Sequence, residues 1–101
     1  MVKRIVWTEK ALHTKKEIFD FWTKQTGNKT YSRKLESGFD KLINSILLFP
    51  ELGRKIENYD ARVLIKGDYS IIYKLIVEES SLEIKILQIW DTRRDPDKLK
   101  I

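Results

Sequence analysis

ARVLIKGDYSIIYKLIVEESSLEIKILQIWDTRRD, residues 61–95, contains most of the strand-forming signal in this chain. The pair Gly67-Asp68 predicts a two-residue hairpin loop, because glycine adopts the positive φ that such a loop requires and β-branched and aromatic residues flank the pair. A loop of this length fixes the register of its two strands. The opposite pairs that we expect are Lys66 with Tyr69, Leu64 with Ile71 and Arg62 with Tyr73.

The same register gives the hairpin two faces, because successive side chains of a strand alternate. One of these faces carries Val63, Ile65, Ser70 and Ile72. Past a second loop near residues 79–81, apolar residues alternate with charged ones up to Ile86, which is typical of a strand with one solvated face. The alternation stops over residues 87–90, so this end of the strand is either buried on both faces or bulged.

Two helices are predicted upstream of these strands. The first begins after Thr8, which suits the N-cap position, and ends at Gly27-Asn28, while the second spans residues 30–48 and stops before Pro50. Their connection is short, so the helices are antiparallel neighbours. Apolar residues recur at helical spacing in both, namely Ala11, Leu12, Ile18, Phe19 and Trp22, then Leu35, Phe39, Leu42, Ile43, Ile46 and Phe49.

The ends of the chain complete the predicted fold. Residues 2–8 are rich in β-forming side chains and are expected to join the sheet, whereas residues 51–60 are predicted to be a polar connection. The predicted class is α+β: an N-terminal strand, an antiparallel helix hairpin, then a three-stranded antiparallel meander, with all strands in one sheet. The helices cover one face of this sheet and leave the other partly open. A chain of 101 residues supports one core, so we expect a single domain over residues 1–101.

The amino-acid composition restricts the cellular compartment and the kinds of partner that we expect for the protein. The absence of cysteine excludes disulfides, thiolate metal sites and cysteine nucleophiles, and it is typical of a reducing cytoplasm, where we expect the protein to reside. No apolar run approaches the length that spans a bilayer, so no membrane partner is expected. The net charge of +5 favours an acidic partner such as nucleic acid, the ribosome or an acidic protein segment. Many small domains carry such a charge for solubility alone.

Few residues of the chain could carry out catalysis. The chain has a single histidine, so a catalytic site that needs two histidines is excluded. This residue, His13, falls on the polar face of the first predicted helix. Asp68, Glu83 and Lys85 resemble the ligand spacing of metal-dependent nucleases, but alternating charge on a solvated strand gives the same pattern. We therefore expect no metal site and no cofactor.

Arginines stand at the ends of several predicted elements. Arg54 follows a turn, Arg62 begins a strand, and Arg93 and Arg94 follow the last strand. In an antiparallel sheet, the start of one strand and the end of the next but one can meet at the same edge, so Arg62 could converge with Arg93 or Arg94. A convergent cluster recognises carboxylate or phosphate, whereas separate solvated arginines contribute little. The pattern alone leaves both interpretations open.

Four motifs occur in the order found in one known superfamily. They are PELGR at residues 50–54, RVLIKGDY at 62–69, YSIIYK at 69–74 and WDTRRDP at 90–96. Together they resemble the ParE/RelE toxin superfamily over nearly the whole chain. The resemblance implies the toxin half of a bacterial type II toxin-antitoxin module, held inactive in a hetero-oligomer with a cognate antitoxin.

The resemblance covers two mechanisms. RelE-like members cleave mRNA on the ribosome without a metal, and they use basic side chains on the open sheet face where this chain has Val63, Ile65, Ser70 and Ile72. An aliphatic face supplies neither acid, base nor cationic stabilisation. ParE-like members are associated with poisoning of DNA gyrase by binding, and Arg54, Arg62 and the Arg94-Asp95 pair match that branch. One departure is Trp90, where many members have histidine.

We therefore expect a gyrase-binding toxin with no catalytic residues. The alternatives are a ribosome-dependent, metal-independent endoribonuclease using Arg62, Arg93 and Arg94, and a non-toxic basic binding module. The residues expected to bind the target are Arg54, Arg62, Tyr69, Tyr73, Trp90, Arg93, Arg94 and Asp95. Those expected to bind the antitoxin are Val63, Ile65 and Ile72.

Overall fold

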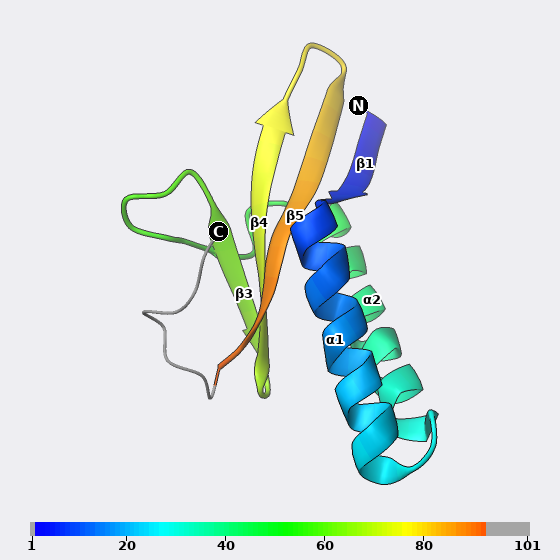
Figure 1. The fold of residues 1–101 in the computed structure, drawn as a ribbon. Coiled ribbons are helices and arrows are strands. Elements are labelled where there is room, and N and C mark those ends of the chain that lie inside the picture. The colour runs from blue at the N-terminus through cyan, green and yellow to red at the C-terminus, as the bar shows by residue number, and fades with distance from the viewer. Residues whose placement is uncertain (1, 93–101) are drawn as a thin grey trace.

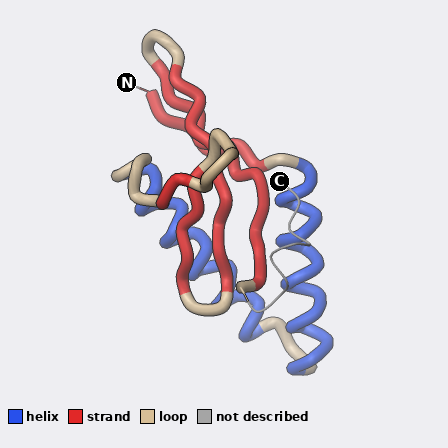
Figure 2. Tube along the Cα trace, turned by 90° about the vertical axis from the view of Figure 1, so that its left-hand side faces the viewer, coloured by secondary structure: helices blue, strands red, loops and turns tan. Residues whose placement is uncertain are grey.

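A computed structural model describes residues 2–92 as one mixed sheet with two helices on one of its faces (Figures 1 and 2). The described residues form five strands and two helices in the order β1 (Val2–Trp7), α1 (Glu9–Thr26), α2 (Thr30–Leu48), β2 (Arg54–Lys55), β3 (Arg62–Lys66), β4 (Tyr69–Val77) and β5 (Ser81–Asp91). The strands lie in the order β1-β5-β4-β3-β2. The predicted α+β class is therefore confirmed.

The two helices begin and end as their sequence predicts. Thr8 has extended backbone angles and its side chain accepts a hydrogen bond from the amide of Ala11, which makes it the N-cap of α1. Gly27 adopts a φ of +79° at the C-cap, a conformation that glycine tolerates best. Neither helix of the described residues is long and apolar enough to cross a membrane.

Two residues of the predicted apolar stripes, Leu12 and Phe49, are largely exposed to solvent. Leu12 is 49% exposed because it lies on the flank of α1, next to the fully buried Ala11. Phe49 is 65% exposed because α2 ends at Leu48 and Phe49 has non-helical backbone angles, so the helical period no longer applies to it. The core is instead built from Ala11, Phe39, Ile43, Ile46, Tyr69, Ile71, Tyr73, Leu82, Ile84, Ile86 and Ile89.

The β3–β4 hairpin has the predicted register. Gly67 has a φ of +60°, and Leu64 lies opposite Ile71 while Arg62 lies opposite Tyr73. The side chains of Tyr69, Ile71 and Tyr73 belong to the core beneath the helices. Alternation along the strands therefore places Val63, Ile65, Ser70 and Ile72 on the opposite face, which we call the open face.

A β-bulge explains why the apolar pattern of β5 stops alternating. Tyr73 pairs with Ile86 while the preceding Ile72 pairs with Gln88, so Leu87 is an extra residue in β5. Ile86 and Ile89 are three positions apart, yet both are fully buried. The bulge brings both side chains to the helix-covered face.

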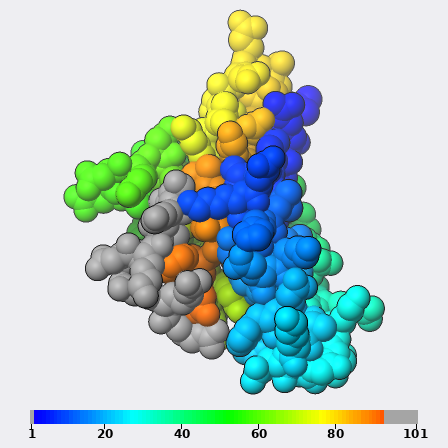
Figure 3. Space-filling model, in the orientation of Figure 1, coloured from blue at the N-terminus to red at the C-terminus, as the bar shows by residue number. Residues whose placement is uncertain are grey.

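The edges of the sheet contain one predicted and one unexpected strand. β1 joins the sheet as predicted and pairs in parallel with β5, with Ile5 opposite Ile84. The segment 51–60, which we expected to be only a connection, contains the two-residue strand β2, paired through Arg54 with Val63. The connection from β2 to β3 projects from the body of the molecule (Figure 3).

Candidate functional site

The open face contains a hollow of about 550 Å³ where several predicted site residues meet. Val63 and Ile65 line it from β3, and Ser70 and Ile72 line it from β4. Ile65 is 55% exposed, whereas Ile72 is only 1% exposed. The three residues predicted to bind an antitoxin therefore lie on one face of the sheet, where Ile65 is the most exposed of them, Val63 is partly exposed and Ile72 is buried. We call this surface the open-face hollow.

Arg54 is the predicted arginine that lies at the open-face hollow. Its pairing with Val63 places it on the open face, and its side chain is exposed at the rim next to Lys55. Glu57 is the acidic residue of the same lining. Arginine at such a position can bind a carboxylate or phosphate in a bidentate manner.

Arg62 lies on the other face and has a different environment. The register places it opposite Tyr73, and it is partly buried. Its Nη1 donates hydrogen bonds to the carbonyl oxygens of Gly53, at 2.8 Å, and Glu51, at 3.2 Å. The structure therefore does not bring Arg54 and Arg62 to one face. Arg93, Arg94 and Asp95 lie outside the described residues.

The Pro50–Gly53 turn is held by Tyr73 as well as by Arg62. The Tyr73 hydroxyl donates to the carbonyl of Pro50 at 2.8 Å and accepts from the amide of Gly53 at 2.7 Å. A Cβ at position 53 would lie 2.7 Å from the Tyr73 ring, so only glycine fits there. Because β2 follows directly, these contacts set the position of Arg54.

The pKa of the Tyr73 hydroxyl is raised above its ordinary value of 10.0, mainly because burial disfavours the phenolate. The hydrogen bond from Gly53 and the charge of Arg62 act in the opposite direction, and the charge of Glu51 adds to the increase. Tyr73 is therefore protonated at neutral pH. Its side chain is fully buried, and the two hydrogen bonds of its hydroxyl hold the backbone of the Pro50–Gly53 turn in place.

Tyr69 also lies under the helices. It is 6% exposed, its hydroxyl accepts a hydrogen bond from Nε1 of Trp22 at 2.8 Å, and its ring meets the edge of Phe39 at a centroid distance of 5.6 Å. These contacts join β4 to both helices. The role predicted for Tyr69 and Tyr73 in binding a target therefore falls on two side chains that are buried in this structure.

Trp90 is a partly buried residue between two hollows. It lines the open-face hollow and also a second hollow of about 340 Å³ between α1 and β5, whose lining includes Phe21 and Trp22. The backbone carbonyl of Trp90 accepts a hydrogen bond from Oγ of Ser70 at 3.3 Å. Trp90 thus connects the open face with the α1 side of the molecule.

Sequence reasoning missed an apolar surface at the end of α2. Leu48, Phe49, Leu52 and Val77 surround a hollow of about 590 Å³ and are 70%, 65%, 48% and 69% exposed. We call these four residues the apolar patch. The signal that could have revealed it is the run LLFPEL at residues 47–52, which continues past the end of the helix. Exposed apolar residues that cluster in this way mark interaction surfaces.

Comparison with known proteins identifies the family. The family model described as "ParE toxin of type II toxin-antitoxin system, parDE" matches residues 5–96. This match covers most of the chain, so the protein belongs to the ParE toxin family, as its four motifs predict. A search of curated proteins gave no significant match.

Two solved structures share the fold. One is described as the chromosomal ParDE TA system from P. aeruginosa; it is 18% identical, has a TM-score of 0.64, and the match covers 86% of this chain and 96% of that chain. The other is a YoeB/ParE toxin from Agrobacterium tumefaciens, 18% identical with a TM-score of 0.57, covering 87% and 97%. At this identity the likeness establishes the fold alone.

Proposed function

We propose that this ParE-family toxin stops bacterial growth by binding a DNA topoisomerase, gyrase, and that a cognate antitoxin prevents this binding. The family implies the antitoxin partner. The observation that carries the choice of target is the aliphatic character of the open face, where Val63, Ile65 and Ile72 are among the residues that line the hollow. A binding surface needs such residues, and a nuclease site does not.

The chemistry of RNA cleavage supports the same choice. Cleavage of a phosphodiester requires a base for the attacking hydroxyl, an acid for the leaving oxygen and cations near the developing charge. Among residues 2–92, the open-face hollow is lined by two cations, Arg54 and Lys55, both at its β2 rim. The hydroxyl in this lining that comes from β4 is that of Ser70, which is buried and donates to the Trp90 carbonyl.

Arg54 is the described residue best suited to bind the target. It is exposed on the open face, and its backbone is fixed by β2 and by the turn that Tyr73 and Arg62 hold. A fixed arginine next to apolar side chains is typical of the residues that dominate binding energy at protein interfaces. Arg62 acts through the turn and so positions Arg54.

The antitoxin is proposed to cover the open-face hollow. Ile65 is exposed and Val63 is partly exposed, so an apolar side chain of an antitoxin segment can bury area against them. Occupation of the hollow would place the segment beside Arg54. Neutralisation then follows from competition for one surface.

Two assays performed side by side test the proposed target. Purified toxin is added to gyrase with relaxed plasmid DNA, and separately to translating ribosomes with a labelled mRNA. We expect inhibition of supercoiling and intact mRNA. Arg54→Ala should raise the half-inhibitory concentration at least about fivefold, since arginine is enriched among interface hot spots. Lys24→Ala, which removes an exposed cation from the last turn of α1, should change it less than about twofold.

Three results would count against the proposal in different ways. Cleavage of mRNA that disappears in Arg94→Ala would establish the endoribonuclease instead. Unimpaired growth at high soluble expression would indicate a basic binding module without toxic action. Equal inhibition by wild type and Arg54→Ala would leave gyrase as the target but remove Arg54 from the interface. Circular dichroism of each variant checks that it is folded.

A further inference from the structure

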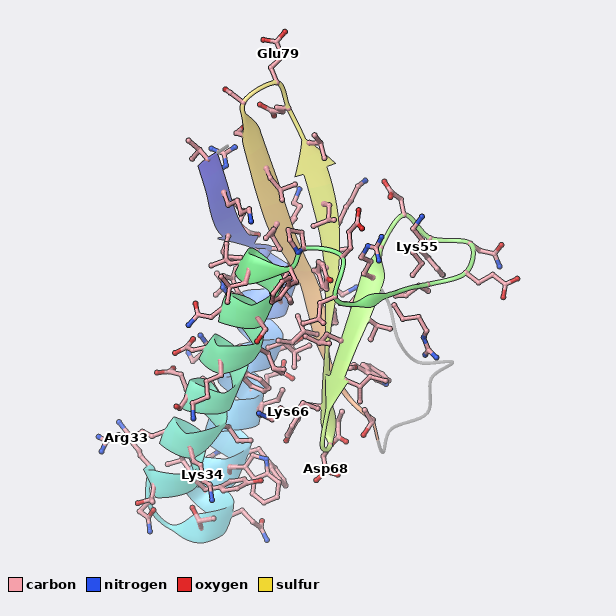
Figure 4. All side chains as sticks on the ribbon, turned by 180° about the vertical axis from the view of Figure 1, so that it is seen from behind. Arg33, Lys34, Lys55, Lys66, Asp68 and Glu79 are labelled. Carbon is pink, nitrogen blue, oxygen red and sulfur yellow. The ribbon has the colours of Figure 1, made fainter. Side chains whose placement is uncertain are left out.

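The connection between β2 and β3, residues 56–61, extends beyond the edge of the sheet, because β2 is the last strand in the strand order. Figures 1 and 3 show this connection projecting from the body of the molecule. Figure 4 shows Lys55 at its start, on the other side of the molecule from Arg33 and Lys34 of α2. We call residues 56–61 the edge loop. Because the loop is convex, a partner that binds it must offer a concave surface.

The edge loop has a defined backbone conformation. The amide of Ile56 donates to the carbonyl of Ala61 at 3.0 Å and closes the loop, and the amide of Tyr59 donates to the carbonyl of Ile56 at 3.3 Å within it. Asn58 adopts a φ of +68°, a conformation that asparagine tolerates better than most residues. Both ends are anchored, since Ala61 is buried and Ile56 is partly buried. A loop that is already ordered loses little conformational entropy on binding.

Tyr59 is the aromatic side chain that the edge loop presents to solvent. It is 60% exposed. The other aromatic residues in the described part of the chain that are more than half exposed are Phe21, on α1, and Phe49, at the C-cap of α2. Tyr59 also lines a hollow of about 240 Å³ together with Arg62, which lies on the face opposite to Arg54. Tyr59 and Arg54 therefore flank the β2 edge from opposite sides.

The charges of the edge loop favour a protein partner over a nucleic acid. Glu57 and Asp60 are exposed, and the loop sequence IENYDA contains no cation. Asp60 lies 3.5 Å from Nζ of Lys74, but its side chain is 88% exposed. Such carboxylates repel a phosphate backbone, whereas a protein can place donors opposite them. Tyrosine is enriched at protein interfaces, because its ring buries apolar area while its hydroxyl still finds a hydrogen-bond partner.

We propose that the edge loop inserts Tyr59 into a cleft of the toxin's protein target, an inference that deepens the proposed function and rests on it. The ring fills the cleft, and the carboxylates of the loop meet donors at the rim. Arg54 contacts the target from the other side of β2. The target therefore binds around the β2 edge of the sheet, with Tyr59 as the anchor.

Substitution of Tyr59 tests this assignment in the supercoiling assay with purified gyrase. Tyr59→Ala should raise the half-inhibitory concentration at least about tenfold, because a tyrosine buried in a cleft is typical of the residues that dominate binding energy. Tyr59→Phe keeps the ring and should raise it less than about threefold. The control is Phe49→Ala, which removes an exposed ring outside the edge loop and should raise it less than about twofold. Circular dichroism checks that each variant is folded.

Nitration of tyrosine by tetranitromethane measures the contact directly. In the free toxin Tyr59 should react, since it is 60% exposed, whereas Tyr69 and Tyr73 should be protected by burial. Addition of gyrase should lower the nitration of Tyr59 at least about fivefold, because a side chain at the core of an interface is inaccessible to solvent. Serum albumin at the same concentration should leave it unchanged. Mass spectrometry of peptides provides the measurement.

The results that would overturn the inference are distinct from those that would overturn the proposed function. Unchanged inhibition by Tyr59→Ala, with weaker inhibition by Arg54→Ala, would overturn this inference and leave the proposed function in place. An equal loss in Tyr59→Ala and Phe49→Ala, or in Tyr59→Ala and Tyr59→Phe, would overturn insertion of the ring. Binding of a DNA duplex of about 20 base pairs that Tyr59→Ala abolishes would assign the loop to nucleic acid instead. Absence of inhibition by wild type would overturn the gyrase target and this inference together.

Discussion

Tyr73 connects two segments that are twenty positions apart in the chain through a single hydroxyl group. That hydroxyl binds the carbonyl of Pro50 and the amide of Gly53, and its removal would leave both backbone groups without this partner. A buried polar group without a partner destabilises a protein by about 1–3 kcal/mol. The Pro50–Gly53 turn, and with it the position of Arg54, therefore depends on the Tyr73 hydroxyl together with the hydrogen bonds from Arg62.

Tyr73→Phe should lower the free energy of unfolding by about 1–3 kcal/mol at neutral pH. The raised pKa of Tyr73 in the folded state means that its stabilisation is complete below pH 10.0, the ordinary tyrosine pKa. As the pH rises above that value, the unfolded chain loses the proton first, so the wild type loses this stability until the folded-state pKa is passed. The difference in the free energy of unfolding between wild type and Tyr73→Phe should therefore decrease as the pH rises above 10.0.

Urea unfolding at about pH 8 and about pH 11 measures this difference. Tyr59→Phe is the matched control, since Tyr59 is 60% exposed, and it should change stability by less than about 0.5 kcal/mol at either pH. If the difference in the free energy of unfolding between wild type and Tyr73→Phe were larger at the higher pH, the stabilisation could not come from the protonated Tyr73 hydroxyl.

The sequence predicts a turn at residues 50–54 but does not predict which side chains hold it in place. The motif PELGR predicts a turn, and Arg62 and Tyr73 are predicted to face each other, as they do. Their contact with the turn could not be predicted, because it depends on where a loop folds back over the sheet. Both residues were therefore assigned to target binding, although one is fully buried and the other bonds to turn carbonyls.

Thr8 links the start of α1 to the bulge in β5. Its hydroxyl oxygen accepts from the amide of Ala11, and the same hydroxyl donates to the carbonyl of Leu87 at 3.2 Å. Leu87 is the extra residue of the bulge. One side chain thus fixes where the helix begins and where the strand departs from regular pairing.

Thr8→Ala should lower the free energy of unfolding by about 1–2 kcal/mol, because an N-cap is lost together with a bond to the bulge. Thr26→Ala removes a threonine at the other end of α1, whose hydroxyl donates only to exposed backbone carbonyls, and should have an effect below about 0.5 kcal/mol. Thr8→Ser, which keeps the hydroxyl, should retain most of the stability. Chemical denaturation of the three variants provides the comparison. Equal effects of Thr8→Ala and Thr26→Ala would refute the capping role.

Elements with a strong local signal were predicted well, and elements defined by distant contacts were not. Gly67 determines a hairpin by itself, so the register of β3 and β4 followed from the sequence. The apolar run at the end of β5 was compatible with a bulge or with burial on both faces. Pairing with β4 shows the bulge, and the burial of the adjacent Gln88 and Ile89 shows that both faces are covered there as well. β2 has two residues and no periodicity, so its existence depends on the neighbouring β3.

The surface of the whole molecule combines net positive charge with the apolar patch. Like charge keeps copies apart at low ionic strength, but salt screens this repulsion within a Debye length of about 8 Å at physiological ionic strength. Contacts between exposed apolar residues persist when salt is added. Without a partner, the toxin therefore has a surface that favours self-association in salt.

Phe49→Ser with Val77→Thr should reduce this self-association without loss of stability, because both side chains are already exposed to solvent. Sedimentation velocity over a range of protein and salt concentrations provides the measurement. The control is Phe21→Ser with Val2→Thr, which changes residues that are 56% and 67% exposed and lie outside the patch. Concentration-dependent sedimentation that is the same in both double variants would exclude the apolar patch as its cause.

The parallel pairing of β1 with β5 affects the moment at which the toxin can fold during synthesis. β1 is synthesised before the other described strands, yet its neighbour in the sheet is β5 (Ser81–Asp91), the last of them. β5 also supplies Leu82, Ile84, Ile86 and Ile89 to the core, so the nascent chain cannot complete that core while these residues are inside the ribosome. The sheet and its core can therefore form only after β5 has been synthesised and has left the ribosome. A chain whose synthesis stops before β5 therefore lacks the strand that joins β1 to β4 and cannot form the complete sheet.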